Sequence, residues 1–198
     1  RFGYNKSSQV MEIASNDGYL LQYFAEKGIP VLGIEPTGNT ADVAIAKGID
    51  TIKDFFGVSL ASQLVAAGKK ADLLLGNNVL AHVPDIVDFV GGMKIVLAPQ
   101  GVITMEFPHL LQLVENNQFD TIYHEHFSYL SFTTVSRIFE AAGLEMFDVE
   151  ELTTHGGSLR IYAKHKEDTT KAIGEAVSAM FEKEKKTGLL KMNYYSNF

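Results

Sequence analysis

Short apolar runs that suit strands alternate with helix-like segments through the first half of this chain. The expected strands cover residues 9–13, 30–35, 48–52, 71–76 and 101–107, and the expected helices cover residues 17–27, 39–47, 58–67 and 84–98. Parallel strands need long crossover connections, which are usually helices. The alternation therefore predicts an α/β fold with a doubly wound, mostly parallel sheet and helices on both faces.

The second half of the chain follows a different pattern. Helices are expected over residues 109–115 and 133–142, on either side of a stretch rich in histidine, and strands over residues 143–152 and 157–165. The tetrapeptide THGG separates these two strands and is typical of a hairpin turn. We therefore expect the sheet to end in a C-terminal antiparallel hairpin.

Length and composition suit one globular core. The chain has 198 residues, of which 46% are hydrophobic and 21% charged, close to the average for globular proteins. We expect one domain over residues 1–166. Residues 167–198 are expected to form a helical extension, with its helix over 168–190, that leads toward a further domain.

Charge and residue content disfavour several classes of partner. The formal net charge of −7 opposes binding to the phosphate backbone of a nucleic acid. The apolar runs are too short to cross a membrane, and the absence of cysteine excludes disulfides and thiolate catalysis within this chain. A cytoplasmic protein that acts on a small molecule fits these features best. They leave the oligomeric state open.

The first strand-to-helix junction, MEIASNDGYLLQYF, carries the clearest sign of a ligand site. It places Glu12 inside the strand and Ser15, Asn16, Asp17 and Gly18 in the turn that follows. Ligands of open parallel sheets bind at the carboxyl ends of the strands, near the point where strand order reverses. A buried carboxylate in a strand is also costly unless it is used. We expect the ligand beside this junction.

The charge of the junction favours one class of cofactor. A dinucleotide needs glycines and a positive helix N-terminus near its pyrophosphate, whereas this turn has a single glycine and places Asp17 at the expected helix cap. S-adenosylmethionine has no phosphate, and its sulfonium and ammonium match the carboxylates of Glu12 and Asp17. Asp17 could equally be a plain N-cap. Glu35, at the end of the second strand, suits the ribose hydroxyls of either cofactor.

The ends of the third and fourth strands add further candidates. Asp54 and Phe55 follow the third strand, where they could bind and cover an adenine, and Asn77, Asn78 and His82 follow the fourth. Structural alternatives exist for these residues, because Phe55 could pack in the core and the asparagines could cap exposed backbone.

Five segments together carry a family resemblance. They are EIASNDGYLLQ (12–22), GIEP (33–36), NNVLAHVPD (77–85), VITMEFPHL (102–110) and YHEHFSYLS (123–131). In this order they resemble the S-adenosylmethionine-dependent C-methyltransferases that act on nucleotide-linked keto-deoxysugars, and the similarity covers residues 9–165. It implies a class I methyltransferase, Rossmann-like fold with S-adenosylmethionine as cofactor. The implied cofactor contacts are Glu12, Ala14, Ser15, Asn16, Asp17, Gly18, Glu35, Pro36, Asp54, Phe55, Asn77 and Asn78.

Members of that family usually carry a cysteine-rich zinc domain before this domain and a further α/β domain after it. Because this chain has 198 residues and no cysteine, we expect it to be the central methyltransferase domain of a longer protein. It should bind S-adenosylmethionine but hold a nucleotide-linked sugar weakly.

The stretch YHEHFSY, which begins at Tyr123, is rich in groups that handle protons. Methylation of carbon requires removal of a proton next to a ketone and stabilisation of the enolate, which a general base and hydrogen-bond donors provide. If the stretch is extended, Tyr123 and Glu125 point to one side and His124 and His126 to the other, whereas a tight turn would change this division. The resemblance marks His126 as the base, His82 and Tyr123 as enolate or sugar contacts, and Glu125 as the orienting carboxylate.

Other interpretations stay open. The histidines could be polar residues of a loop over the core, or could bind a metal together with His109 and Glu106, although a His-x-His pair is a weak signal and the reaction needs no metal. The fold also suits an NAD-dependent oxidoreductase, or a non-catalytic module that binds a cofactor or a sugar. Methylation of oxygen or nitrogen would need a base as well.

Overall fold

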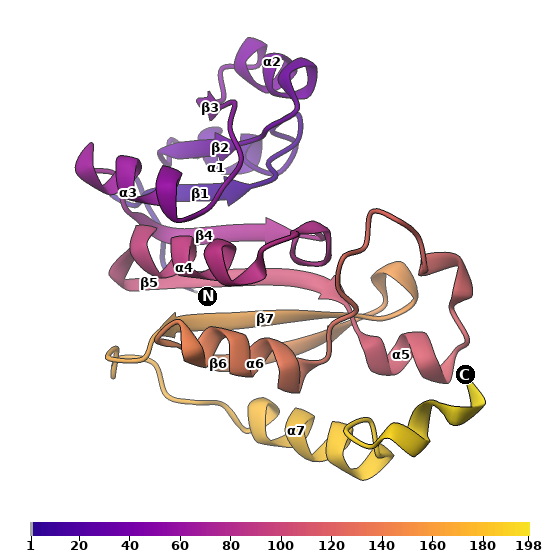
Figure 1. Cartoon of the computed structure of the whole chain (residues 1–198). Coiled ribbons are helices and arrows are strands. Elements are labelled where there is room, and N and C mark those ends of the chain that lie inside the picture. Colours follow the sequence, from indigo (N-terminus) through magenta and orange to yellow (C-terminus); the bar gives the residue numbers. More distant parts are fainter. Residues whose placement is uncertain (1) are drawn as a thin grey trace.

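Seven strands form one sheet, in the order β3-β2-β1-β4-β5-β7-β6 (Figure 1). The computed structural model describes residues 2–198, and Arg1, where the expected first domain begins, lies outside them. The strands are β1 (Val10–Ile13), β2 (Val31–Ile34), β3 (Thr51–Ile52), β4 (Ala71–Asn77), β5 (Leu97–Pro108), β6 (Leu144–Leu152) and β7 (Ser158–His165). β7 runs antiparallel to β5 and β6, and the other pairs are parallel. The predicted mostly parallel sheet with a C-terminal hairpin is confirmed.

The strand order reverses between β1 and β4. From β1 the chain moves outward through β2 to β3, and then returns to the other side of β1, where it forms β4 and β5. Loops that leave neighbouring strands in opposite directions open a crevice at their carboxyl ends. The reversal therefore lies beside the junction that the sequence marks as a ligand site.

Helices cover both faces of the sheet (Figure 1). The helices are α1 (Gln22–Ala25), α2 (Gly38–Ala46), α3 (Val58–Ala66), α4 (Ile86–Val96), α5 (Leu110–Glu115), α6 (Phe132–Ala141) and α7 (Glu175–Thr187). Short 3₁₀ turns are η1 (Leu80–His82), η2 (Phe119–Thr121), η3 (Thr154–Gly156) and η4 (Met192–Asn197). The larger core cluster packs α3, α4, α6 and α7 against one face, and the smaller one packs the chain around α1 and α2 against the other. Burial on both faces explains why strands such as ADLLLG are apolar throughout.

Some predicted boundaries are wrong. The helix expected over residues 17–27 is reduced to the four residues of α1, because Gly18 adopts a φ of 76° and the residues before Gln22 form turns. β3 has two residues instead of the expected 48–52. The helix expected from residue 168 begins at Glu175, because Asp168 folds the preceding loop by accepting hydrogen bonds from the backbone and the hydroxyl of Thr170.

Helix α7 lies in the expected extension and packs on the same core. Its residues Val177 and Met180 are buried in the larger cluster, and the helix contacts β6 and α6. The expected extension therefore packs against the domain through α7, and whether it leads toward a further domain stays a prediction. A domain boundary near residue 166 remains a prediction.

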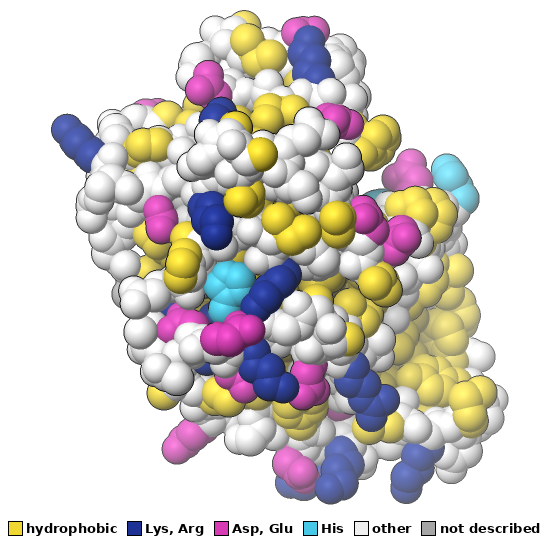
Figure 2. All heavy atoms as spheres, turned by 60° about the vertical axis from the view of Figure 1, so that its left-hand side comes forward, with side chains coloured by type: hydrophobic (Ala, Val, Ile, Leu, Met, Phe, Trp, Pro, Cys, Tyr) yellow, Lys and Arg dark blue, Asp and Glu magenta, His cyan; other side chains and the backbone are white. Residues whose placement is uncertain are grey.

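Charges of both signs are mixed on the side of the molecule that Figure 2 brings forward, with lysine and arginine next to aspartate and glutamate. Among the described residues, ion pairs such as Lys94–Glu167 and Lys166–Glu140 join charges of opposite sign. This mixture differs from the single-sign basic surface that binds nucleic acids. Within residues 2–198, no helix has both the length and the apolar character that crossing a membrane requires.

Candidate active site

A cavity of about 410 Å³ opens beside the carboxyl ends of β1 and β2, within the range of small-molecule sites. It is bounded by residues that follow four strands. The lining includes Ile13, Ala14, Ile34, Glu35, Pro36, Asp54, Phe55, Phe56, Val79, His82, Val83, Pro84, Asp85, Asp88 and Phe89. Of the expected cofactor contacts, Ala14, Glu35, Pro36, Asp54 and Phe55 line this cavity together with His82. Phe55 is 80% exposed, which excludes the alternative that it packs in the core.

The turn after β1 repeatedly uses left-handed backbone. Ala14 and Asn16 both have φ of 55°, and Gly18 has φ of 76°. Glu35 holds this turn against β2, because one of its oxygens accepts from the Asn16 amide (3.1 Å) and the other from the Thr37 amide (2.8 Å). Each oxygen keeps a further lone pair for a ligand. Glu35 therefore has a structural role in the cavity wall. Its predicted contact with a ribose would be a second role.

Ala14 should be strained in its left-handed conformation, which costs about 1–2 kcal/mol for a residue other than glycine. We expect Ala14→Gly to raise the free energy of unfolding by about 0.5–1 kcal/mol. The same change at Ala179, an exposed residue inside α7, should lower it by about 1 kcal/mol. Urea denaturation of both variants measures the two values. Equal destabilisation would contradict the strain assigned to Ala14.

Asp17 does not cap a helix, contrary to the sequence-based expectation. Its carboxylate pairs with Lys47 Nζ at 2.6 Å on the surface, and the hydrogen bond from Lys47 is the main reason why the pKa of Asp17 is lowered. Helix α1 begins only at Gln22, and the cap position belongs to Leu21. A pyrophosphate is disfavoured because this turn has no helix N-terminus to bind it. The charge of Asp17 does not oppose it, since Lys47 compensates that charge.

Glu12 is the most unusual ionisable group beside the cavity. It is 1% exposed, and its Oε2 atom has no hydrogen-bond partner among the described residues. Burial raises the pKa of this carboxyl to about 8. Glu12 is therefore mainly neutral at neutral pH in the ligand-free protein, and an incoming cation would favour its ionised form. Glu12 is not part of the cavity lining, so its contact with the cationic part of a cofactor remains a prediction, which the unpaired Oε2 atom supports.

Tyr19 was missed as a site residue although it lies in the motif EIASNDGYLLQ. Burial is the main cause that raises the pKa of Tyr19, the charges of Glu12 and Glu106 raise it further, and a hydrogen bond with the Asn77 side chain lowers it. Tyr19 is thus a further candidate, in the turn after β1, that lies near both Glu12 and Asn77. Sequence spacing gives no sign of that arrangement, because the three residues come from different strands and turns.

The other predicted cofactor contacts lie outside the cavity lining. Ser15 is fully buried, and its hydroxyl has no partner among the residues described. Gly18 packs inward, where an added Cβ would lie 3.1 Å from Ile49. Asn78 has φ of 55°, and its amide bonds to the carbonyl of Glu106 at 2.8 Å. These residues shape the backbone next to the site, and their contact with a cofactor remains a prediction.

The histidine-rich stretch forms a tight turn, which is the second of the two conformations that the sequence left open. The amide of His126 bonds to the carbonyl of Tyr123 at 3.1 Å, and the amide of Phe127 bonds to Ala81 in η1 at 2.9 Å. The turn brings the rings of Tyr123 and His126 to the same side, with centroids 4.3 Å apart. The ring of His82 lies 4.8 Å from that of His126. Since His82 lines the cavity, it connects the cavity to His126.

The orientation of His126 is fixed by a backbone carbonyl. Its Nδ1 lies 2.8 Å from the carbonyl oxygen of Thr121, and only a protonated Nδ1 can donate to that oxygen. Nε2 of the neutral ring then carries the free lone pair. The Thr121 carbonyl, and not Glu125, thus holds His126 in place. The Glu125 carboxylate is exposed and lies 4.0 Å from His124 Nε2, its charge also acts on His82, and its orienting role remains a prediction.

His82 is held mainly neutral. Its partial burial is the main cause that lowers its pKa, and the neighbouring His126 lowers it further. A hydrogen bond with the Glu125 backbone raises the pKa and uses the one N–H of the neutral ring. His82, Tyr123 and His126 thus bring two ring nitrogens with free lone pairs and one hydroxyl donor together.

The ligands of the alternative metal site are separated in space. His109 pairs with Glu184, Glu106 bonds to Arg160 and Thr154, and His124 is largely exposed. Across the described part of the chain, no three histidine, aspartate or glutamate side chains are placed to share a metal ion.

The strand order, with its single antiparallel strand β7, and the cavity beside β1 and β2 define the class I S-adenosylmethionine-dependent methyltransferase fold. Two solved structures share it. One is a methyltransferase in complex with the Haloferax volcanii Trm112 activator (TM-score 0.65, 13% identity, 83% of this chain and 85% of that one). The other is magnesium protoporphyrin IX methyltransferase from Synechocystis with bound S-adenosylhomocysteine (TM-score 0.61, 14% identity, 79% and 73%).

The chain belongs to the methyltransferase-domain family, whose model matches residues 1–149. A second model, described as the C-methyltransferase C-terminal domain, matches residues 153–198. The chain is 35% identical over its whole length to C-methyltransferase NovU from Streptomyces niveus, and it spans 47% of that protein. The chain is thus a methyltransferase, and the cofactor of this class is S-adenosylmethionine.

Proposed function

We propose that this chain catalyses methyl transfer to carbon in a nucleotide-linked keto-deoxysugar, with His126 as the general base. The observation that carries the proposal is the bond between His126 Nδ1 and the Thr121 carbonyl, which leaves Nε2 as the free base beside His82 and the cavity. The full-length similarity to a C-methyltransferase supports the reaction class.

The cavity lining offers groups for the ribose and the adenine, and residues near the carboxyl end of β1 would meet the rest of the cofactor. Glu35 would bind the ribose hydroxyls, Asp54 and Phe55 would bind and cover the adenine, and Glu12 would face the cationic end together with Tyr19. When bound, S-adenosylmethionine supplies a methyl group on a sulfonium, which a carbon nucleophile can take.

The residues of the histidine turn would prepare that nucleophile. His126 Nε2 accepts the proton from the carbon next to the ketone, and the electron pair of the broken C–H bond moves into the enolate. Tyr123 donates its hydroxyl to the enolate oxygen. His82 shares its N–H with the Glu125 backbone, so its other ring nitrogen would accept a hydrogen bond from a sugar hydroxyl. The enolate carbon would then bond to the methyl while the methyl–sulfur bond breaks and its electron pair stays on sulfur, so that S-adenosylhomocysteine leaves. The proton on His126 passes to solvent through the exposed side of the turn.

Titration calorimetry with S-adenosylhomocysteine, and with NAD in parallel, tests the cofactor assignment. We expect S-adenosylhomocysteine to bind and NAD not to bind, because the turn after β1 has no helix N-terminus for a pyrophosphate. The variant Glu35→Ala should weaken S-adenosylhomocysteine by about tenfold or more. Binding of NAD alone would refute the proposal and favour an oxidoreductase.

A further inference from the structure

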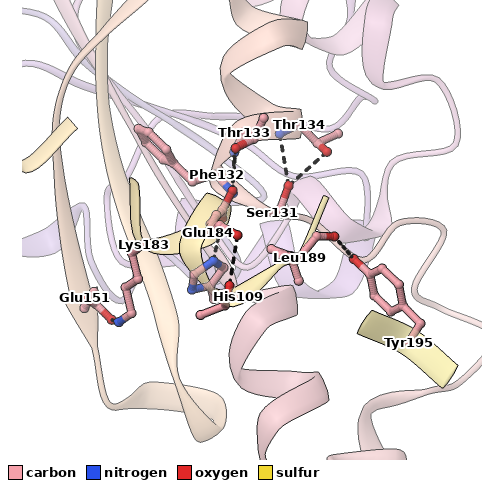
Figure 3. Close-up of polar contacts among 11 residues, drawn as sticks. His109, Ser131, Phe132, Thr133, Thr134, Glu151, Lys183, Glu184, Leu189 and Tyr195 are labelled. Carbon is pink, nitrogen blue, oxygen red and sulfur yellow. Dashed lines mark hydrogen bonds and ion pairs between the residues drawn. The ribbon is translucent and has the colours of Figure 1, made fainter. Parts of the chain in front are cut away.

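Helix α7 carries a carboxylate that is completely buried. Glu184 is 0% exposed. Its Oε1 atom lies 2.7 Å from His109 Nε2 and 2.6 Å from the Phe132 amide, and its Oε2 atom lies 2.9 Å from the Thr133 amide and 2.6 Å from the Thr133 hydroxyl (Figure 3). Burial alone would raise the pKa of Glu184, but these hydrogen bonds outweigh it and the pKa is lowered. Glu184 is therefore an ionised group whose bonds are all made inside the protein.

Three of the four bonds come from the first turn of α6, two from backbone amides and one from the Thr133 hydroxyl. The amides of Phe132 and Thr133 have no partner within the helix, because the first amides of any helix lack one. Ser131 caps the helix by accepting from the Thr134 amide at 3.1 Å, and Glu184 satisfies the two amides before it. The positive end of the helix dipole adds to the attraction. Glu184 thus fixes where α6 begins.

The bond to His109 fixes a second point of the chain. His109 is 1% exposed, and its Nδ1 has no partner among the residues described. It forms a bridge with Leu130, and the Leu110 amide bonds to the Leu130 carbonyl at 2.9 Å. The chain therefore leaves the sheet at His109 and returns to the same place at Leu130. The excursion between them, residues 110–130, contains the histidine turn and Thr121.

We propose that Glu184 is a positioning residue for His126. It joins His109, before the excursion, to Phe132 and Thr133, just after it, and so holds both ends of the segment whose middle carries Thr121 and His126. The proposal rests on the proposed function for its catalytic consequence, although the positioning itself does not depend on which residue is the base. Helix α7 packs on β6, the edge strand of the sheet. The proposal gives this helix a role at the histidine turn.

The neighbouring residue offers a matched control. Lys183 lies on the same helix and pairs with Glu151 at 2.5 Å, but both side chains are exposed, by 37% and 50% (Figure 3). Removing an exposed pair changes stability little. Lys183→Ala therefore tests whether any loss of a polar contact from α7 disturbs the histidine turn.

The test is hydrogen exchange of backbone amides in Glu184→Gln, measured beside Lys183→Ala. We expect Glu184→Gln to speed exchange of the His126 and Phe127 amides by about tenfold or more, while the amides of β1 and β2 and the affinity for S-adenosylhomocysteine stay unchanged. The glutamine keeps the size of the side chain but loses the charge that binds two amides and an imidazole. Lys183→Ala should leave all of these values unchanged.

A milder variant guards against loss of folding. Thr133→Val removes a single bond to Glu184, and should speed exchange of the same two amides by a smaller factor. Unchanged exchange in both variants would overturn the proposal, and so would an equal rise in exchange across the whole sheet, which a purely structural role predicts.

The catalytic consequence has a separate measurement. Glu184→Gln should lower kcat by about tenfold or more with little change in KM for the cofactor. If His126 is not the base, His126→Asn will leave turnover intact, whereas the local exchange in Glu184→Gln will still rise. The two proposals can therefore fail independently.

Discussion

Glu12→Gln is expected to stabilise the ligand-free protein and to weaken cofactor binding. The pKa of Glu12 is raised by burial from 4.5 to about 8, so the folded state keeps a proton that the unfolded state releases. The contribution of protonated Glu12 to the free energy of unfolding is then fully present below pH 4.5, and it is lost as the pH rises through about 8. The glutamine cannot ionise, and its advantage at neutral pH should be about 2–3 kcal/mol. Urea denaturation of both proteins at pH 4.5 and pH 8 measures the difference.

The same substitution should reduce the affinity for S-adenosylhomocysteine by about tenfold or more, because a buried carboxylate that meets an ammonium is lost. Wild-type binding at neutral pH should also release protons, since the ligand favours the ionised form of Glu12. Calorimetry in buffers of different ionisation enthalpy detects that release. No proton release, with unchanged affinity in the variant, would show that Glu12 does not face the cofactor.

Glu106 provides the control for this argument. It is also buried, at 6% exposure, but it accepts from Arg160 at 2.8 Å and from Thr154 at 2.9 Å. Because its charge is paired, Glu106→Gln should destabilise the protein by about 1–3 kcal/mol. We expect the change in the free energy of unfolding to be positive for Glu12→Gln and negative for Glu106→Gln. Opposite signs would indicate that Glu12 serves a ligand and Glu106 the structure.

His126→Ala is expected to lower the rate of methyl transfer by about 10²–10⁴-fold, the usual contribution of a general base. Affinity for S-adenosylhomocysteine should change by less than about threefold, because His126 lies outside the cavity lining. The measurement is the single-turnover rate with a nucleotide-linked keto-deoxysugar and S-adenosylmethionine.

His124 gives a control of the same residue type from the same turn. Its side chain is 89% exposed, so His124→Ala should keep the wild-type rate. Similar losses of rate in the two variants would indicate a general disturbance of the turn. A wild-type rate in His126→Ala would show that His126 is not the base.

The sheet could be predicted from the sequence because its signal is local and repeated. Runs such as ADLLLG and GVITMEF are apolar throughout, as strands buried on both faces must be, and helical segments separate them. The first helix was expected from residue 17 but begins at Gln22. The physical cause is Gly18, whose left-handed conformation is not helical. A single glycine after a strand does not reveal which conformation it takes.

The site could be predicted only in part. Glu35, Phe55 and His82 come together because each follows a strand of one parallel sheet, which is a rule of topology. The partner of His126 is a backbone carbonyl, at Thr121, and no side-chain pattern marks such a partner. Glu184 lies 75 residues from His109, and in the sequence it is one charge among several in EKEKK.

The most direct test of the account is proton exchange without methyl transfer. The protein is mixed with S-adenosylhomocysteine and a nucleotide-linked keto-deoxysugar in D₂O, and deuterium at the carbon next to the ketone is followed by NMR. We expect the wild type and His124→Ala to incorporate deuterium at similar rates, and His126→Asn to be slower by about a hundredfold or more. Incorporation by His126→Asn at the wild-type rate would contradict the assignment of His126 as the base.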